Sequence, residues 1–438
     1  MDAFVEIGQL IGFMWKLFLY WWWLPGFFFF SGKFDYYWTW WRNELWFNTI
    51  WKPLLLEIKI PKELPKSIKA MEAMFTALHG TVYNDPDWWE KYITGEPQTS
   101  FKFEIASIDG KIHFYIRFFA DYRESVEAAI YSQFPEAEIE AVPEYSKQVP
   151  LDMPDRDWDL FGWDYKMVKL PQYPIPTYER YVEPGIEEEE KIDPITSLME
   201  GMAKLKPGEQ MWIQISARPI YFDDKEGKKF IEGGVRIRDI LTKRIDEKKE
   251  ALPPLWKETL EVIFHGPKLE EEAGPELFPA EMRLTAGERE LVEAVEKKIS
   301  KPFFACYIRN MYVARREVMY MPNYRLMYNY FNNFTSPELN SLWLWAKTLT
   351  RVKKSPLPFV NALLDRREYV KKRRLLRVYR DRLSYYSPWS SGDLGSQIKL
   401  NVEELASLYH FPSHIVSPTP GIQRTESKES VAPGNLPV

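Results

Sequence analysis

Residues 101–119 read FKFEIASIDGKIHFYIRFF, and this stretch sets the architecture expected for the chain. Apolar and polar side chains alternate on both sides of the pair Asp109-Gly110. Alternation of this kind is typical of a strand with one buried face, and Asp-Gly between two strands indicates a two-residue turn. The stretch therefore predicts an antiparallel hairpin. Its inward side chains are expected to be Phe103, Ile105, Ile112 and Phe114.

The segments that flank the hairpin complete a βαββαβ unit. Residues 54–60 (LLLEIKI) predict a strand, and apolar side chains then recur at helical spacing until Gly80. A helix over about 122–133 and a strand over 137–142 (AEIEAV) are expected after the hairpin. This order is that of the ferredoxin-like fold, so residues 52–150 are predicted to form one such module. Its helices are expected to bury Met71, Phe75 and Ile130.

A weaker second copy of the same pattern follows. Asp193-Pro194 supplies an N-cap and a first-turn proline for a helix, and residues 209–220 (EQMWIQISARPI) predict the next strand. An insertion of charged helical segments occupies about 221–282. A further strand is expected over 303–314 (FFACYIRNMYVA), before a helix rich in tyrosine. The pattern therefore indicates a repeated module with a long insertion.

The tripeptide YIR supports the repeat, because it falls at corresponding places, residues 115–117 and 307–309. We therefore expect an α+β chain with two tandem ferredoxin-like modules. The second module is assigned to residues 151–350 and carries the insertion.

The N-terminal segment predicts a membrane anchor. Residues 7–30 (IGQLIGFMWKLFLYWWWLPGFFFF) contain a single charge, and their length spans a bilayer core. Pro25-Gly26 also allows a re-entrant hairpin, and a buried core helix is the alternative. Cations follow the segment, so the positive-inside rule places the rest of the chain in the cytoplasm. We expect a transmembrane helix within residues 1–51, single-pass topology and a location in the cell membrane.

Residues 351–390 are predicted to form a basic helical segment. From Arg351 to Arg382 there are twelve Lys or Arg against three acidic residues, in a chain of net charge −5. A basic amphipathic helix binds anionic lipid, nucleic acid or an acidic partner, but a helix packed by its leucines, with its arginines in solvent, has the same pattern. The candidate polyanion-binding residues are Arg366, Arg367, Lys371, Lys372, Arg373, Arg374, Arg377 and Arg380.

The motifs of common catalytic and metal sites are missing from the sequence. It contains no G-x-x-x-x-G-K-[ST], no G-x-S-x-G and no H-E-x-x-H. Cys306 is the single cysteine, which excludes an internal disulfide and a cysteine-clustered metal site. We therefore expect no enzymatic activity, no catalytic residue, no cofactor and no metal.

Three further stretches carry a resemblance to a known family. Residues 56–80 (LEIKIPKELPKSIKAMEAMFTALHG), residues 193–219 (DPITSLMEGMAKLKPGEQMWIQISARP) and the C-terminal stretch NVEELASLYHFP, which begins at Asn401, are its evidence. They resemble the N-terminal, membrane-anchored region of type IV secretion/conjugation-type, DNA-translocating ATPases of candidate-phyla bacteria. In that family the last segment leads into a hexameric RecA-like motor domain. This chain lacks the Walker residues, so the resemblance assigns no ATPase activity to any position.

The resemblance implies a non-catalytic platform or accessory subunit of a translocation system. Residues 391–438 would then be a connector to a motor ATPase, with further expected contacts to the membrane, to DNA through the basic helix and to copies of the same chain. The alternative is a membrane-associated protein that binds nucleic acid or lipid through residues 351–382. The candidate partner-docking residues are Leu405, Leu408, Tyr409 and Phe411.

Overall fold

The computed structural model describes residues 12–16, 20, 34, 37–46, 49–50, 52–61, 68–82, 87–96, 98–181, 193–242, 284–382, 397–412 and 424–425. The chain divides into two units. The first unit contains Met1–Lys52, Asn84–Thr99 and Leu383–Leu394, and the second contains Pro53–Tyr83, Ser100–Arg382 and Gly395–Val438. The predicted module boundary at residue 150 therefore falls inside the second unit.

The first unit contains a helix rich in aromatic residues, 37–46, and a short π-helix, η1 (Glu90–Thr94). The Trp38 indole Nε1 donates a hydrogen bond to the Tyr92 carbonyl at 2.8 Å, which joins the two helices. Gly95 follows η1 with a φ of 77°, in the left-handed region that glycine adopts readily.

The prediction of an N-terminal transmembrane helix is wrong. Within the described ranges, no helix combines the length and the apolar character needed to cross a bilayer. Most of the predicted span, residues 7–30, lies outside the described residues, and the described part, 12–16 and 20, is helical. The predicted fold class therefore loses its first element. The predictions of single-pass topology and of a cell-membrane location are contradicted by the same finding.

Residues 53–141 of the second unit follow the predicted βαββαβ order. Strand β3 pairs with β2 on one side and with β1 on the other, and β4 pairs with the far side of β1. All these pairings are antiparallel, and the order β4-β1-β3-β2 is that of a ferredoxin-like sheet. The elements are β1 (Pro53–Pro61), α3 (Ile68–Thr81), β2 (Phe101–Ile108), β3 (Lys111–Phe119), α4 (Arg123–Gln133) and β4 (Glu138–Ala141).

The hairpin of β2 and β3 turns where the sequence predicts. Ile108 pairs with Lys111, so Asp109 and Gly110 form a two-residue loop. Their φ angles are 53° and 82°, and two successive positive values are the mark of a type I′ turn. Asp and Gly tolerate these angles, which fixes the register of both strands.

Residues 158–344 repeat the topology with an insertion. Strand β7 pairs with β6 and β5, and β8 pairs with the far side of β5, so the order β8-β5-β7-β6 matches that of the first half. The insertion between β6 and β7 contains α6 and α8, so it extends beyond the predicted end at about 282, and residues 243–283 lie outside the described residues. The elements are β5 (Trp158–Met167), α5 (Thr196–Ala203), β6 (Glu209–Ile220), α6 (Lys225–Leu241), α8 (Ala286–Ser300), β7 (Phe303–Arg315), α9 (Tyr324–Asn332) and β8 (Leu342–Leu344).

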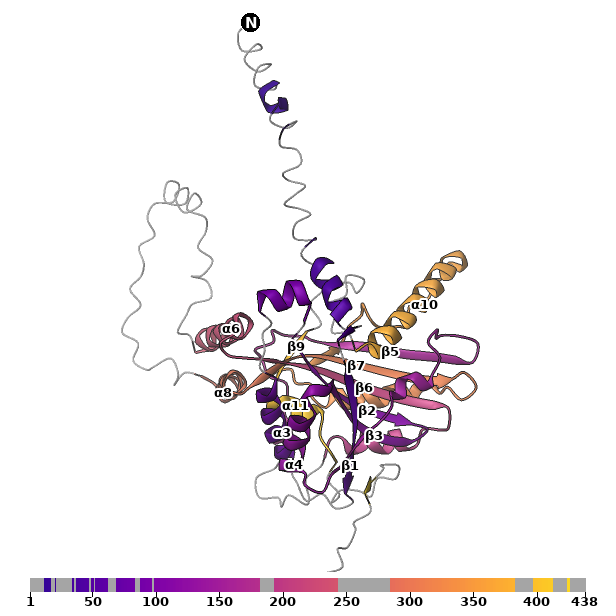
Figure 1. Cartoon of the computed structure of the whole chain (residues 1–438), viewed down its shortest axis with the longest axis horizontal. Coiled ribbons are helices and arrows are strands. Elements are labelled where there is room, and N and C mark those ends of the chain that lie inside the picture. The colour runs from indigo at the N-terminus through magenta and orange to yellow at the C-terminus, as the bar shows by residue number, and fades with distance from the viewer. Residues whose placement is uncertain are drawn as a thin grey trace, which may run out of the picture. The chain divides into compact units, whose positions relative to one another are not determined.

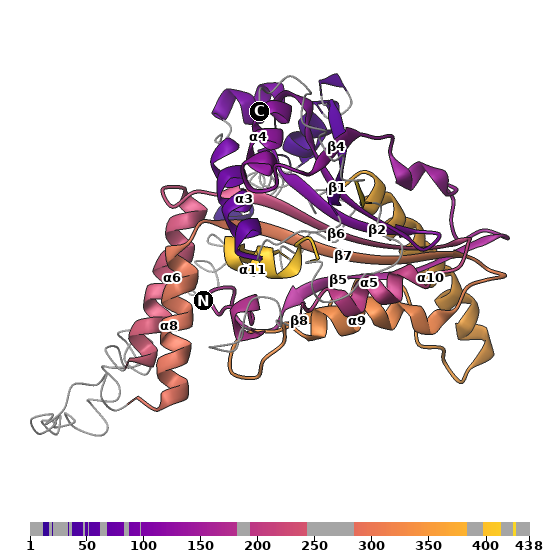
Figure 2. The same cartoon turned by 90° about the horizontal axis from the view of Figure 1, so that it is seen from below.

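The two halves are joined into one sheet by their edge strands. Strands β2 and β6 pair antiparallel from Phe101↔Ala217 to Ile108↔Gln210, so the sheet runs without a break through both halves (Figures 1 and 2). Further strands add to it: β9 (Ile398–Asn401) pairs with β7, and β10 (Arg424–Thr425) adds parallel to β1. Short 3-10 turns at Ala120–Tyr122, Tyr145–Gln148, Tyr178–Tyr181 and Met321–Asn323 complete the described elements.

The two faces of the sheet have different cores. Helices α3, α4, α5, α9 and α11 (Val402–Leu408) contribute to the first core, which includes Phe75, Phe103 and Tyr409. The second core lies on the opposite face, where α10 (Pro358–Arg380) packs against strands from both halves. Because both faces are covered near the centre, the junction of β2 and β6 is buried.

We predict that Phe75→Ala lowers the free energy of unfolding by about 3–5 kcal/mol, because the ring is fully buried and meets Phe103 edge-on at a centroid distance of 4.9 Å. Chemical denaturation of the full chain, followed by circular dichroism, measures the change. Tyr131→Ala, at a side chain that is 41% exposed on α4, is the control and should have little effect. Equal losses for the two variants would contradict the assigned core.

Candidate functional site

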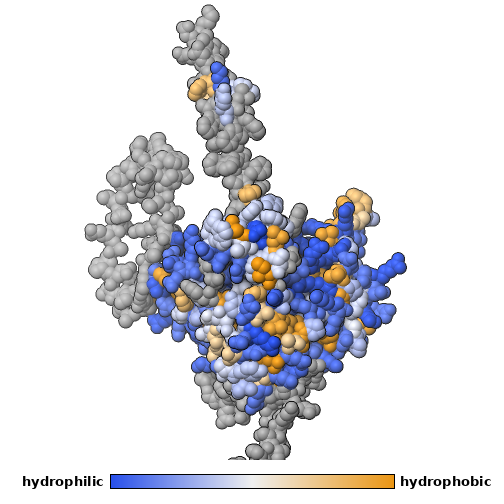
Figure 3. Space-filling model, viewed as in Figure 1, coloured by the Kyte–Doolittle hydropathy of each residue, from blue (hydrophilic) through white to orange (hydrophobic). Residues whose placement is uncertain are grey.

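Helix α10 combines a buried C-terminal half with a projecting N-terminal half. Leu375, Leu376 and Tyr379 are buried in the second core, whereas the N-terminal half extends beyond the sheet (Figure 1). There Phe359 is 73% exposed and Leu363 is 68% exposed. Figure 3 shows apolar surface at the outer end of α10 beside strongly hydrophilic surface. We take this helix as the candidate site.

The end of α10 is held by a buried carboxylate. Glu104 of β2 is fully buried, and Arg382 donates to it from Nε to Oε1 at 2.9 Å and from Nη2 to Oε2 at 3.1 Å. The Tyr145 hydroxyl donates to Oε2 at 2.7 Å, and Gln214 Nε2 donates to Oε1 at 2.8 Å. A buried charge is stable only when it is paired and hydrogen-bonded. These contacts tie the chain just beyond α10 to the junction of β2 and β6.

A second buried ion pair caps the helix. Arg309 Nε lies 2.8 Å from Asp164 Oδ1, and Arg309 Nη1 donates to the Val378 carbonyl at 3.2 Å. Gln214 Nε2 reaches the Tyr379 carbonyl at 3.3 Å. The last carbonyls of a helix lack donors within the helix. Arg309 and Gln214 supply donors to two of these carbonyls from the sheet, which ties the end of α10 to β6 and β7.

Burial acts differently on the two ionisable groups that β2 places on this face. It would raise the pKa of Glu104, but the charge of Arg382 and the hydrogen bonds to the carboxylate hold that pKa below its ordinary value. For Lys102 the compensation is weaker. Burial, reinforced by the charge of Arg117, lowers the pKa of Lys102 to about 7, although the charge of Glu104 acts in the opposite direction. Folding therefore disfavours the charged form of Lys102.

The predicted polyanion-binding residues divide into two sets of four. Lys372 and Arg373 form ion pairs with the aspartates of β5 and of the loop before it, at positions 159 and 152. Lys371 and Arg380 donate to backbone carbonyls. These four cations therefore serve the fold. The other four are exposed and have no ionic partner among the described residues: Arg366, Arg367, Arg374 and Arg377.

The predicted docking residues lie in the core. Glu404 of α11 is fully buried, lies 3.0 Å from Lys298 Nζ and accepts from the Ile175 amide at 2.8 Å. Side chains enclosed in this way offer no surface to a separate partner, so the predicted docking role is not what the structure shows. The rest of the predicted connector, 391–396, 413–423 and 426–438, lies outside the described residues. The four predicted residues, with exposed fractions of 0–3%, are Leu405, Leu408, Tyr409 and Phe411.

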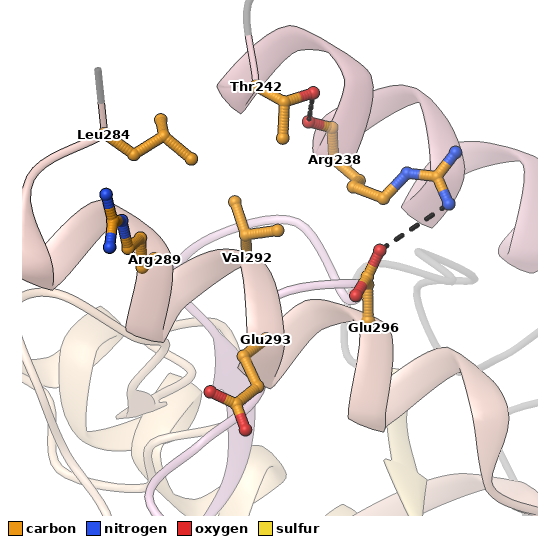
Figure 4. Close-up of a pocket in the computed structure, with 7 residues that line it drawn as sticks. All are labelled: Arg238, Thr242, Leu284, Arg289, Val292, Glu293 and Glu296. Atoms are coloured by element: carbon orange, nitrogen blue, oxygen red, sulfur yellow. Dashed lines mark hydrogen bonds and ion pairs between the residues drawn. The ribbon is translucent and has the colours of Figure 1, made fainter. Parts of the chain in front are cut away.

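A cavity of about 360 Å³ lies between α6 and α8 (Figure 4). Arg238 Nη1 and Glu296 Oε1 are 3.6 Å apart across it, and the Thr242 hydroxyl donates to the Arg238 carbonyl at 2.9 Å. Over the described residues, no three His, Cys, Asp or Glu side chains are placed to hold a metal ion. The cavity is lined by Arg238, Thr242, Leu284, Arg289, Val292, Glu293 and Glu296.

A family model described as "Domain of unknown function (DUF8128)" matches residues 51–423, which is most of the chain. No curated protein matches the chain. Neither finding supports the predicted link to type IV secretion or conjugation; the resemblance behind it stays a prediction, whereas the predicted transmembrane helix is contradicted.

We predict that Glu104→Ala lowers the free energy of unfolding by about 3–5 kcal/mol, because the change leaves the buried Arg382 charge uncompensated. Glu140→Ala removes a solvent-exposed partner of Lys59 and should cost about 1 kcal/mol or less. Denaturant titration of both variants measures the difference. A Glu104 variant as stable as the Glu140 variant would show that the buried pair does not anchor α10.

We predict that Lys102→Met stabilises the protein most at and below about pH 7. Folding lowers the pKa of Lys102 from its ordinary value to about 7, because burial beside Arg117, Arg309 and Arg382 disfavours the charged form. The unfolded chain therefore binds the proton more tightly between pH 7 and about 10, and wild-type stability gains from this group as pH rises through that window. The advantage of the Met variant should shrink by up to about 1.4 kcal/mol per pH unit there.

Denaturation of both proteins at several pH values checks this trend. Lys147→Met, at an exposed side chain, is the control and should give a difference that does not change with pH. A difference for Lys102→Met that is equally constant with pH would contradict the prediction.

Proposed function

We propose that this chain, which belongs to the DUF8128 family, is a non-catalytic assembly platform that binds a partner protein through the projecting half of α10. The observation that carries the proposal is the exposed face of that helix. Phe359, Leu363 and Val370 are 73%, 68% and 54% exposed, and four arginines without an ionic partner in the described structure lie beside them. Exposed apolar side chains grouped on one surface are typical of interaction sites.

The base of the helix supports this role. The pairs Glu104–Arg382 and Arg309–Asp164 hold the C-terminal end of α10 on the sheet. A helix that is fixed before binding loses little conformational entropy when a partner binds to it. The favourable free energy of contacts at the projecting half then contributes to binding, because little of it is lost to ordering the helix.

The chemistry of the buried groups favours a structural role over a catalytic one. Lys102 and Glu104 have shifted pKa values, and strongly shifted groups are candidates for catalysis when they line a cleft. Here both side chains are buried, with exposed fractions of 6% and 0%, so neither is open to a substrate. We therefore propose that Glu104, through its ion pair with Arg382, serves to hold the end of α10.

The expected partner is a motor ATPase supplied as a separate chain. The support is the resemblance of residues 56–80 and 193–219 to the region that precedes such a motor. Because α11 is enclosed, we propose α10 as the docking element in place of the stretch from Asn401 onward.

We predict that a photo-crosslinking amino acid at Leu363 of the full chain, expressed in its own cells, traps one defined partner protein. The same amino acid at Tyr131, exposed on α4, is the matched control and should trap none or unrelated proteins. Adducts separated by electrophoresis and identified by mass spectrometry give the readout. Equal adduct patterns at the two positions, or no adduct at Leu363, would contradict docking through α10.

A further inference from the structure

The exposed face of α10 has an apolar ridge along its middle. At about 100° of rotation per residue, Phe359, Leu363 and Val370 fall within about 40° of one another on the helix surface. They lie roughly opposite the side chains that α10 buries, such as Leu375 and Tyr379. The ridge therefore points away from the sheet. Leu363 and Val370 are also seven residues apart, which is the repeat by which one helix packs along another.

Unpaired arginines border this ridge on both sides. The same rotation places Arg366 along one border and Arg367 and Arg374 along the other, whereas Arg377 continues the line of Phe359 beyond Val370. All four are exposed, and no ionic partner for them occurs among the residues that the structure describes. Arg373, the neighbouring cation, instead forms an ion pair with Asp152. The face thus has an apolar centre and two positive margins.

This arrangement discriminates between classes of partner. A nucleic-acid backbone would satisfy the arginines, but it would bury the apolar ridge against phosphates or polar base edges. A helix with an apolar stripe and acidic flanks satisfies both parts, because apolar side chains meet along the ridge while carboxylates lie beside the arginines. Opposite charges at the flanking positions of paired helices also set partner choice and orientation.

We infer that the projecting face of α10 binds an acidic amphipathic helix of the partner protein, side by side, as in a short two-stranded coiled coil. This inference rests on the proposed docking function and names the chemistry of the partner surface. The partner helix carries apolar residues at heptad spacing and glutamate or aspartate on both flanks of that stripe.

The test uses the full chain and synthetic peptides as probes. One peptide of about four heptads has leucine at positions a and d and glutamate at e and g; a matched peptide has lysine at e and g. Fluorescence anisotropy measures binding of each labelled peptide to the wild-type chain. We expect the glutamate peptide to bind at least about tenfold more tightly than the lysine peptide, and more weakly as salt is added.

Two variants separate the ridge from its margins. Reversing the margins, with Arg366, Arg367, Arg374 and Arg377 each changed to Glu, should invert the preference so that the lysine peptide binds more tightly. Leu363→Asp should weaken binding of the glutamate peptide at least about tenfold without inverting the preference between the two peptides. The control changes four exposed lysines elsewhere to Glu and should leave both affinities unaltered. These control lysines are Lys111, Lys147, Lys204 and Lys206.

Several results would overturn the inference. They are equal binding of the two peptides, a preference that the margin variant does not invert, and absence of binding by the glutamate peptide. Binding of a 20-base-pair DNA duplex or of anionic vesicles in place of the glutamate peptide would assign the face to another class of partner. If the peptides fail while the crosslink at Leu363 persists, the acidic-helix inference fails and the docking function stands.

Discussion

Glu104 and Arg382 form the ion pair on which the rest of the arrangement depends. Glu104 belongs to β2 and lies opposite Gln214 of β6, at the junction of the two halves of the sheet. Its carboxylate binds Arg382 just beyond α10 and also accepts from Gln214. One buried charge thus connects both halves of the sheet to the helix. Burying the charge of Glu104 costs free energy unless its hydrogen-bond donors are in place. The ion pair therefore favours the packing in which Arg382 and Gln214 both reach the carboxylate.

The local pattern of apolar and polar residues was sufficient to predict much of the fold. The alternation around Asp109-Gly110 predicts the hairpin, and the first half of the sheet follows the predicted order of elements. Strand β5 was missed. Its sequence, WDLFGWDYKM, shows little alternation because its central residues are buried on both faces. The pairing of β2 with β6 was also missed, since pairing between edge strands of separate halves depends on contacts far apart in the sequence.

For the candidate site too, the sequence pattern did not predict contacts between residues far apart in the chain. Spacing identifies α10 as a basic amphipathic helix, but it does not tell which cations are free. Arg373 and Lys372 form ion pairs with aspartates that lie more than 200 residues earlier in the sequence, at separations of 221 and 213 residues. The apolar stripe of α11 likewise indicates an amphipathic helix, and only the packing of Glu404 against Lys298 shows that both its faces are enclosed. Periodicity tells which side chains share a face, and tertiary contacts decide what that face meets.

The geometry of α10 has a mechanical consequence. Before the helix, the Thr350 hydroxyl accepts from the Gly162 amide of β5 at 3.1 Å, and after it Arg382 is held by Glu104 of β2. The helix is therefore fixed to strands of both halves. Farther along the chain, β9 pairs with β7 and α11 is enclosed by the same body. A partner bound to the projecting half would thus be held against the whole sheet, because displacing α10 would break the Glu104–Arg382 ion pair and the hydrogen bond from Arg309 to the Val378 carbonyl.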